Sequence, residues 1–100
     1  MSLKTAIVYG SVRRDRMGIR VVRFLEAQIQ ERGHEADVID AKEENLPLLD
    51  LRLSDFDADN RPASLVRLSE RIKAADAFVL VSGEYNHTLQ PGLTNLIDHF

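Results

Sequence analysis

The stretch that decides the fold is VYGSVRRDRMGIRVVRF, residues 8–24. It begins inside a short apolar run, residues 6–9, whose length and β-branched content are typical of a buried strand. Gly10 and Ser11 end that run and start a polar turn with three arginines. Small or apolar residues then recur at helical spacing until Gly33, a frequent type of helix stop; they are Gly18, Val21, Val22, Leu25 and Ile29. The stretch therefore predicts a strand, a polar turn and an amphipathic helix.

Two further pairs of strand and helix are predicted after Gly33. Residues 34–40, HEADVID, alternate apolar and acidic residues, which indicates a less buried strand at a sheet edge. Residues 41–61 are dense in turn formers and predict a long loop. Pro62 is suited to a first helical turn, and an apolar face follows it, formed by Leu65, Leu68, Ile72 and Ala75. Residues 76–83, DAFVLVSG, predict a strand covered on both faces, and a third helix is expected from Pro91 or Gly92.

Alternating strands and helices predict a parallel sheet with right-handed crossovers. Because the first and third strands are the most apolar and the second resembles an edge, we expect the sheet order 2-1-3. This is the start of the flavodoxin-like α/β arrangement, a three-layer fold that binds its ligand outside the carboxyl ends of strands one and three. We expect residues 1–100 to form the N-terminal part of a single domain of this kind, with strands 4 and 5 beyond residue 100.

Composition and charge exclude several classes of protein. The 100 residues are 44% hydrophobic and 29% charged, which is ordinary for a globular domain. A net charge of -3 argues against a basic face for nucleic acid. The absence of cysteine excludes disulfides and thiolate metal sites. No apolar run has the length of a membrane span or a signal peptide. We therefore expect a cytoplasmic protein with no nucleic-acid partner, no membrane contact and no metal.

The arginine-rich turn contains groups suited to an anion. The N–H groups at a helix start carry the positive end of the helix dipole, and a hydroxyl and guanidinium groups assist them in binding phosphate. Ser11, Arg13 and Arg16 supply those side chains. The turn lacks the Gly-Lys-Ser/Thr of a Walker loop and the three glycines of a dinucleotide fold. A surface turn rich in arginine is also often only solvated, so both interpretations stay open.

The segment after the third predicted strand is polar in a different way. It holds a carboxylate, an aromatic ring, an amide and an imidazole in Glu84, Tyr85, Asn86 and His87. These residues are also compatible with simple turn chemistry at the edge of the core. Because both segments are expected at the same end of the sheet, a phosphate site would lie beside an aromatic, amide-rich site. That combination suits a nucleotide-like cofactor with a flat ring.

GSVRRDRMG after the first strand, paired with GEYNHTLQPGLTNLIDHF after the third, resembles the NAD(P)H-dependent FMN reductases of the flavodoxin-like superfamily. The resemblance covers essentially the whole chain. It implies that the FMN phosphate is bound by the first segment, at Ser11, Arg13, Arg16, Met17 and Gly18. It implies that the isoalloxazine ring is bordered by the second segment, at Glu84, Tyr85, Asn86 and His87.

The same resemblance implies an oxidoreductase that passes electrons from NADPH or NADH, through FMN, to quinones, free flavin or similar small acceptors. No catalytic side chain is expected, because the cofactor carries the chemistry. A homodimer or homotetramer is the expected assembly. The alternative is a flavodoxin-like module that binds a phosphate ligand without redox turnover. A receiver domain is a poor match, because its acidic positions are occupied by Gly10, Ser11 and Ser82.

Overall fold

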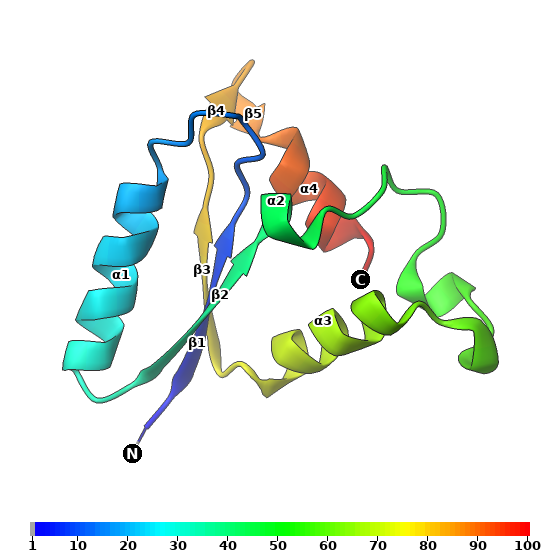
Figure 1. Cartoon of the computed structure of the whole chain (residues 1–100), viewed down its shortest axis with the longest axis horizontal. Helices are drawn as coiled ribbons and strands as arrows, with labels where there is room; N and C mark the ends of the chain where they lie inside the picture. Colours follow the sequence, from blue (N-terminus) through cyan, green and yellow to red (C-terminus); the bar gives the residue numbers. More distant parts are fainter. Residues whose placement is uncertain (1) are drawn as a thin grey trace.

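Three parallel strands form the centre of the computed structural model, which describes residues 2–100 (Figure 1). They are β1 (Lys4–Tyr9), β2 (Glu35–Asp40) and β3 (Ala77–Val81), and their order in the sheet is β2-β1-β3. Ile7 on β1 lies opposite Val38 on β2 and Val79 on β3. The predicted order 2-1-3 and the parallel arrangement are confirmed.

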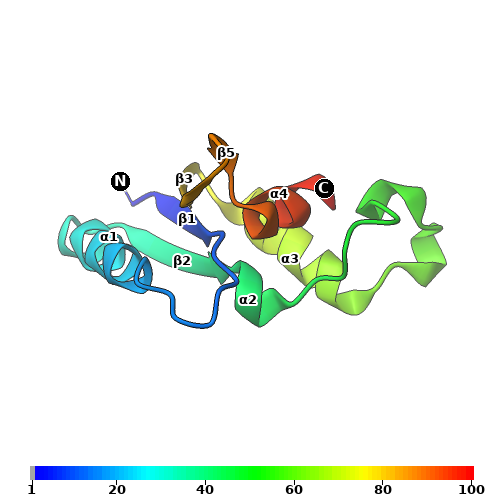
Figure 2. The ribbon, with the colours of Figure 1, turned by 90° about the horizontal axis from the view of Figure 1, so that it is seen from above.

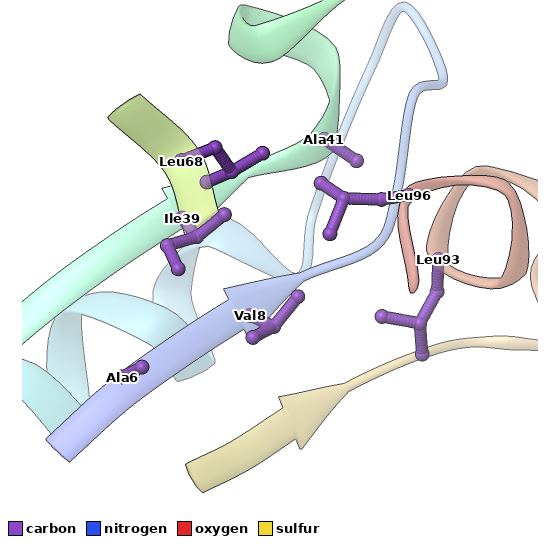
Figure 3. Packing of buried hydrophobic residues seen from close by; sticks show 7 residues of the cluster. All are labelled: Ala6, Val8, Ile39, Ala41, Leu68, Leu93 and Leu96. Carbon is purple, nitrogen blue, oxygen red and sulfur yellow. The ribbon is translucent and has the colours of Figure 1, made fainter. Parts of the chain in front are cut away.

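Helices cover both faces of this sheet, as the view from above shows (Figure 2). On one face, α1 (Ile19–Glu31) contributes Val22 to a cluster with Ile7 and Tyr9. On the other face lie α3 (Ala63–Ala74) and α4 (Pro91–Asp98). A second apolar cluster lies on this face, and Figure 3 shows its residues: Ala6, Val8, Ile39, Ala41, Leu68, Leu93 and Leu96. Alternate residues of β1 face the two clusters, as the pleat of a strand requires.

β1 is buried as predicted, but β3 is more exposed than its sequence indicated. The last four residues of β1 are at most 5% exposed. Phe78 and Leu80 on β3 are each 51% exposed. In the described part of the chain, β3 pairs only with β1 and is an outer strand of the sheet. The expectation of a strand covered on both faces is therefore wrong for this structure. Val21, expected on the buried side of α1, is also half-exposed.

The predicted loop at residues 41–61 contains three short helices. They are α2 (Ala41–Glu44), η1 (Leu53–Asp55) and η2 (Ala58–Asn60). The carboxylate of Asp40 caps α2 by accepting a hydrogen bond from the N–H of Lys42, at 2.9 Å. The rest of the segment is fastened to the end of α4, because the N–H of Leu53 donates to the carbonyl of His99 at 2.7 Å.

The segment after β3 is a small hairpin rather than the open loop that the sequence indicated. β4 (Glu84–Tyr85) and β5 (Thr88–Leu89) pair antiparallel. The two residues between them, Asn86 and His87, both have positive φ, at 54° and 66°. Two consecutive left-handed residues are the arrangement of the tight turns that join the strands of short hairpins. The hairpin stands above the carboxyl end of the sheet (Figure 1).

Candidate functional site

The segment from Gly10 to Gly18 leaves β1 and passes over the carboxyl end of the sheet before α1 begins. The N–H of Gly10 donates to the carbonyl of Val81, at 3.0 Å, which ties the start of the segment to the end of β3. Ser11 is buried, and its Oγ accepts from the N–H of Arg13 at 3.4 Å. The Nζ of Lys42 donates to the carbonyl of Arg13 at 3.1 Å. The backbone of the segment is thus held by the end of β3 and by α2, which follows β2.

Arg16 is held more tightly than any other arginine of this turn. Its Nη1 lies 2.5 Å from Oδ1 of Asp40 and also donates to the carbonyl of Ser11 at 3.3 Å. The guanidinium carbon lies 4.8 Å from the centre of the Tyr9 ring. The hydrogen bond to Asp40 raises the pKa of Arg16 above its already high usual value. Arg16 therefore stays charged, and part of its hydrogen-bonding capacity is used within the protein.

Arg13 and Arg14 are free of such contacts in the described residues. Both are exposed, and neither guanidinium makes a salt bridge within residues 2–100. The two arginines differ in position, because Arg13 lines the cavity beside the turn and Arg14 does not. Arg13 is consequently the arginine whose charge is available to a ligand.

A cavity of about 500 Å³ lies between the arginine-rich turn and the end of β3. The turn contributes all five residues that the sequence predicted for the FMN phosphate, which are Ser11, Arg13, Arg16, Met17 and Gly18. Asp15 and Val21 also line it from this side. From the other side come Val81, Ser82, Gly83 and Gln90, with Tyr9 at the floor. The structure therefore brings the first predicted group together and adds residues that the sequence did not indicate.

The second predicted group is not gathered in this cavity. Glu84 and His87 line a shallower neighbouring cavity of about 550 Å³, which shares Ser82 and Gly83 with the first. Tyr85 and Asn86 line neither of these two cavities. Nδ1 of His87 lies 3.8 Å from a carboxylate oxygen of Glu84, and both side chains are largely exposed. The hairpin borders the site at Ser82 and Gly83, while its tip projects into solvent.

Close backbone packing fixes the turn against the start of α4. A Cβ atom on Gly92 would lie only 2.5 Å from the carbonyl oxygen of Gly10. A Cβ on Gly10 would lie 2.4 Å from the Cβ of Leu93. Real Cβ contacts are not this short, so both positions require glycine for the observed approach. The turn and α4 thus form one packed unit at the carboxyl end of the sheet.

Residues that the sequence analysis missed are Tyr9, Ser82 and Gln90. Ser82 Oγ accepts from the N–H of Gln90 at 3.0 Å and donates to the carbonyl of Gly83 at 2.7 Å. It therefore joins the end of β3 to the start of α4. The polar residue directly after an apolar strand was the only signal that pointed to Ser82. No sequence signal pointed to Tyr9 or Gln90, because only the fold shows that these buried residues line the cavity.

The chemistry of the cavity fits a phosphate-bearing ligand. Its volume lies in the usual range for small-molecule sites, roughly 300 to 1,000 Å³. The first turn of α1 has no acidic residue, and no side chain caps the helix at Gly18. The positive end of the helix dipole is therefore not neutralised locally. Arg13 adds a guanidinium, whereas the exposed carboxylate of Asp15 is the opposing charge on the lining.

Metal-binding clusters and membrane-spanning helices are both absent from residues 2–100. No three or more histidine, aspartate or glutamate side chains in this range are grouped so that they could bind a metal ion. None of the helices in the same range combines the length and apolarity required to cross a bilayer.

The order of the strands and a cavity at their carboxyl ends place the chain in the flavodoxin-like class of α/β proteins. More narrowly, the chain belongs to the NADPH-dependent FMN reductase family, whose family model matches residues 3–100. Comparison with curated protein sequences gave no significant match.

Among solved structures, the chain is similar to an NAD(P)H:quinone oxidoreductase from Methanothermobacter marburgensis, with a TM-score of 0.78 and 20% sequence identity. The match covers 99% of this chain and 53% of that chain. The chain therefore spans about half the length of that solved structure. At this level of identity, the likeness establishes the fold.

Proposed function

We propose that this protein is an FMN-dependent oxidoreductase that transfers electrons from NADPH or NADH to a small acceptor such as a quinone or free flavin. One observation carries the proposal: the five residues predicted to bind the FMN phosphate line a single cavity at the carboxyl end of the sheet. Membership of the NADPH-dependent FMN reductase family supports it.

The residues of the turn have distinct roles in this proposal. Arg13 binds the phosphate through its unpaired guanidinium, and Ser11 and the backbone at Gly18 add hydrogen bonds at the start of α1. Arg16 contributes positive charge from a fixed position, because Asp40 holds it. Met17, which is exposed, covers the ligand from the solvent side.

The hairpin residues Glu84, Tyr85, Asn86 and His87 border the flavin ring in this proposal. Ser82 and Gly83 connect their cavity to the phosphate end of the site. FMN supplies a hydride acceptor whose electrons then pass to the second substrate. The protein has to bind the cofactor, orient it and limit the access of water, and no side chain of residues 2–100 is assigned a catalytic proton transfer.

The phosphate site is tested by calorimetric titration with FMN and with riboflavin, which lacks the phosphate. We expect FMN to bind more tightly. Arg13→Ala should weaken FMN binding about ten- to a hundredfold, the usual worth of a hydrogen bond to a charged group. Arg14→Ala is the matched control, because it removes the same charge at the neighbouring residue, which does not line the cavity. Equal affinities for FMN and riboflavin would remove the role assigned to the turn.

A phosphate-binding module without redox turnover is the second candidate. It is favoured by the position of Tyr85 and Asn86, which line neither of the two cavities. NADPH oxidation in the presence of FMN and a quinone distinguishes the two functions. In the reductase, Tyr85→Ala should loosen FMN and slow its reduction while circular dichroism stays native. Unchanged affinity and rate in this variant would remove Tyr85 from the site, whereas FMN binding without NADPH oxidation in the wild type would favour the module.

Three further properties belong to the same proposal. Residues 1–100 form the N-terminal part of a single FMN-binding domain, the assembly is a homodimer or homotetramer, and the location is cytoplasmic. The half-length match to the solved quinone oxidoreductase is compatible with the first of these. Size-exclusion chromatography with light scattering tests the assembly.

A further inference from the structure

Two buried side chains in residues 2–100 carry a polar atom with no hydrogen-bond partner in the protein. They are the hydroxyl of Tyr9 and the carboxamide oxygen Oε1 of Gln90. Tyr9 is 1% exposed and Gln90 is 6% exposed. Buried polar groups are nearly always hydrogen-bonded, so each exception requires a reason. Both residues line the same cavity of about 500 Å³, although they come from opposite ends of the sequence.

The hydroxyl of Tyr9 lies at the phosphate end of this cavity. The tyrosine ring packs beneath the guanidinium of Arg16. A Cβ atom on Gly18 would lie 3.1 Å from the hydroxyl oxygen, so this oxygen is close to the residue where α1 begins. The ring completes the apolar cluster with Ile7 and Val22. Phenylalanine would fill the same space, and packing alone therefore gives no reason for the hydroxyl.

The carboxamide of Gln90 lies at the β3 end of the cavity. The backbone of Gln90 is fully used, because its N–H donates to Ser82 Oγ and its carbonyl accepts from the N–H groups of Leu93 and Thr94. Its Nε2 lies against Gly83, where a Cβ atom would approach to 2.8 Å. The main chain thus holds Gln90 at the start of α4, and Oε1 at the end of its side chain has no partner in the described residues.

We propose that Tyr9 and Gln90 are two further ligand-binding residues of this cavity. Tyr9 donates a hydrogen bond to an anionic oxygen near the start of α1, and Gln90 accepts one from a hydroxyl or N–H group of the same ligand near the end of β3. The ligand therefore carries a phosphate at one end and a hydrogen-bond donor at the other, as FMN does. This inference rests on the proposed function and extends it to the polar contacts that select the ligand.

The two roles predict different effects on stability and on binding. Tyr9→Phe removes an unpaired buried hydroxyl, so the ligand-free protein should melt at the same or a higher temperature than wild type. Its affinity for FMN should fall about tenfold or more, while its affinity for riboflavin changes little. Gln90→Met keeps the length of the side chain and should weaken FMN and riboflavin equally, about two- to tenfold. A residue with only a structural role would not separate stability from affinity in this way.

The experiment is calorimetric titration of FMN and riboflavin into wild type, Tyr9→Phe, Gln90→Met and the control Gln30→Met, with thermal melts of each protein without ligand. Gln30 is exposed on α1, outside the cavity, and its variant should match wild type. Wild-type affinity in both site variants would overturn this inference and leave the proposed function intact. A wild-type protein that binds no FMN would overturn both. Gln90 is not part of the apolar cluster around Tyr9, so Gln90→Met tests the inference even when Tyr9→Phe lowers the yield of folded protein.

Discussion

Arg16 and Asp40 form an ion pair that fastens the turn after β1 to the end of β2. Only 6% of the Asp40 side chain and 17% of the Arg16 side chain are exposed. The same carboxylate caps α2 through the N–H of Lys42, and Lys42 holds the carbonyl of Arg13. The carboxylate at the end of β2 thus holds the side chain of Arg16 directly and is linked through Lys42 to the main chain of Arg13.

Asp40→Asn should therefore weaken the site without removing any residue that lines it. Asparagine keeps an oxygen to cap α2 but leaves the charge of Arg16 without its partner. We expect a loss of about 1–3 kcal/mol in the free energy of unfolding, less than for a fully buried pair, and a severalfold loss of FMN affinity. Urea unfolding and FMN titration measure the two effects. Glu26→Gln, which breaks the exposed pair with Arg23, is the control and should cost at most about 0.5 kcal/mol.

Gly92→Ala should destabilise the protein by about 1–3 kcal/mol, because its Cβ would approach the carbonyl of Gly10 to 2.5 Å and the backbone would have to separate. Thermal melts and urea titration measure this loss. Gly33→Asn is the contrasting variant: Gly33 has a φ of 81° with nothing near its missing Cβ, and asparagine tolerates this conformation. Similar losses in the two variants would contradict the importance of the close approach.

Acid should weaken the attachment of α3 to the sheet. Arg71 on α3 forms hydrogen bonds with both carboxylate oxygens of Asp37 on β2, at 2.8 and 3.0 Å. These hydrogen bonds lower the pKa of Asp37 below its usual value. The unfolded state therefore binds a proton more readily than the folded state as pH falls. The stabilisation is complete above the unfolded pKa of about 3.9 and is lost as the pH falls through the lower folded value.

Asp37→Asn tests this pH dependence. At pH 7 the variant should be less stable than wild type by about 1 kcal/mol, a modest figure because the pair is partly exposed. The difference between the two proteins should shrink below about pH 4. Urea unfolding at a series of pH values gives both quantities. A difference that stays constant down to pH 2 would show that the charge of Asp37 is not responsible.

The outer edge of β3 should promote association of the 100-residue chain. Phe78 and Leu80 are half-exposed on β3, and within the described residues this strand pairs on one side only. Such edges favour pairing between chains, and a lysine opposes it. Leu80→Lys should therefore reduce the association seen by light scattering. Leu48→Lys is the control, because Leu48 is 87% exposed but lies outside the strands. A monodisperse wild-type monomer would contradict this prediction.

The sheet order was predictable because the apolar patterns differ between strands. Residues 6–9 are uninterrupted by charge, whereas Glu35 and Asp37 alternate with apolar residues. The hairpin at residues 84–89 was not predictable in the same way, because strands of two residues are too short to show a period. Its turn also has Asn86-His87 instead of a glycine-containing pair. The four-residue α2 depends on the cap from Asp40.

The site was predictable only in part, because some of its residues are neighbours in the sequence and others are brought together by the fold. Ser11, Arg13 and Arg16 are close together in the sequence, so local chemistry pointed to them, whereas Met17 and Gly18 were indicated only by the family resemblance. The ion pair of Arg16 depends on Asp40, which the fold brings to the same end of the sheet. Tyr9 and Gln90 have ordinary positions in the sequence, one ending an apolar strand and the other preceding a proline. Their unpartnered polar atoms become apparent only once burial is known.

The contact between Gly10 and the start of α4 also limits which substitutions the protein can accept at Gly10 and Gly92. A side chain larger than hydrogen at Gly10 would meet Leu93, and one at Gly92 would meet the main chain of Gly10. A change at either position is tolerated only when the turn and α4 move apart, which would also shift Ser11 and Gln90 on the cavity wall. Evolutionary change at these distant positions should therefore be coupled, and we expect a homologue with a larger residue at one of them to have a reshaped cavity.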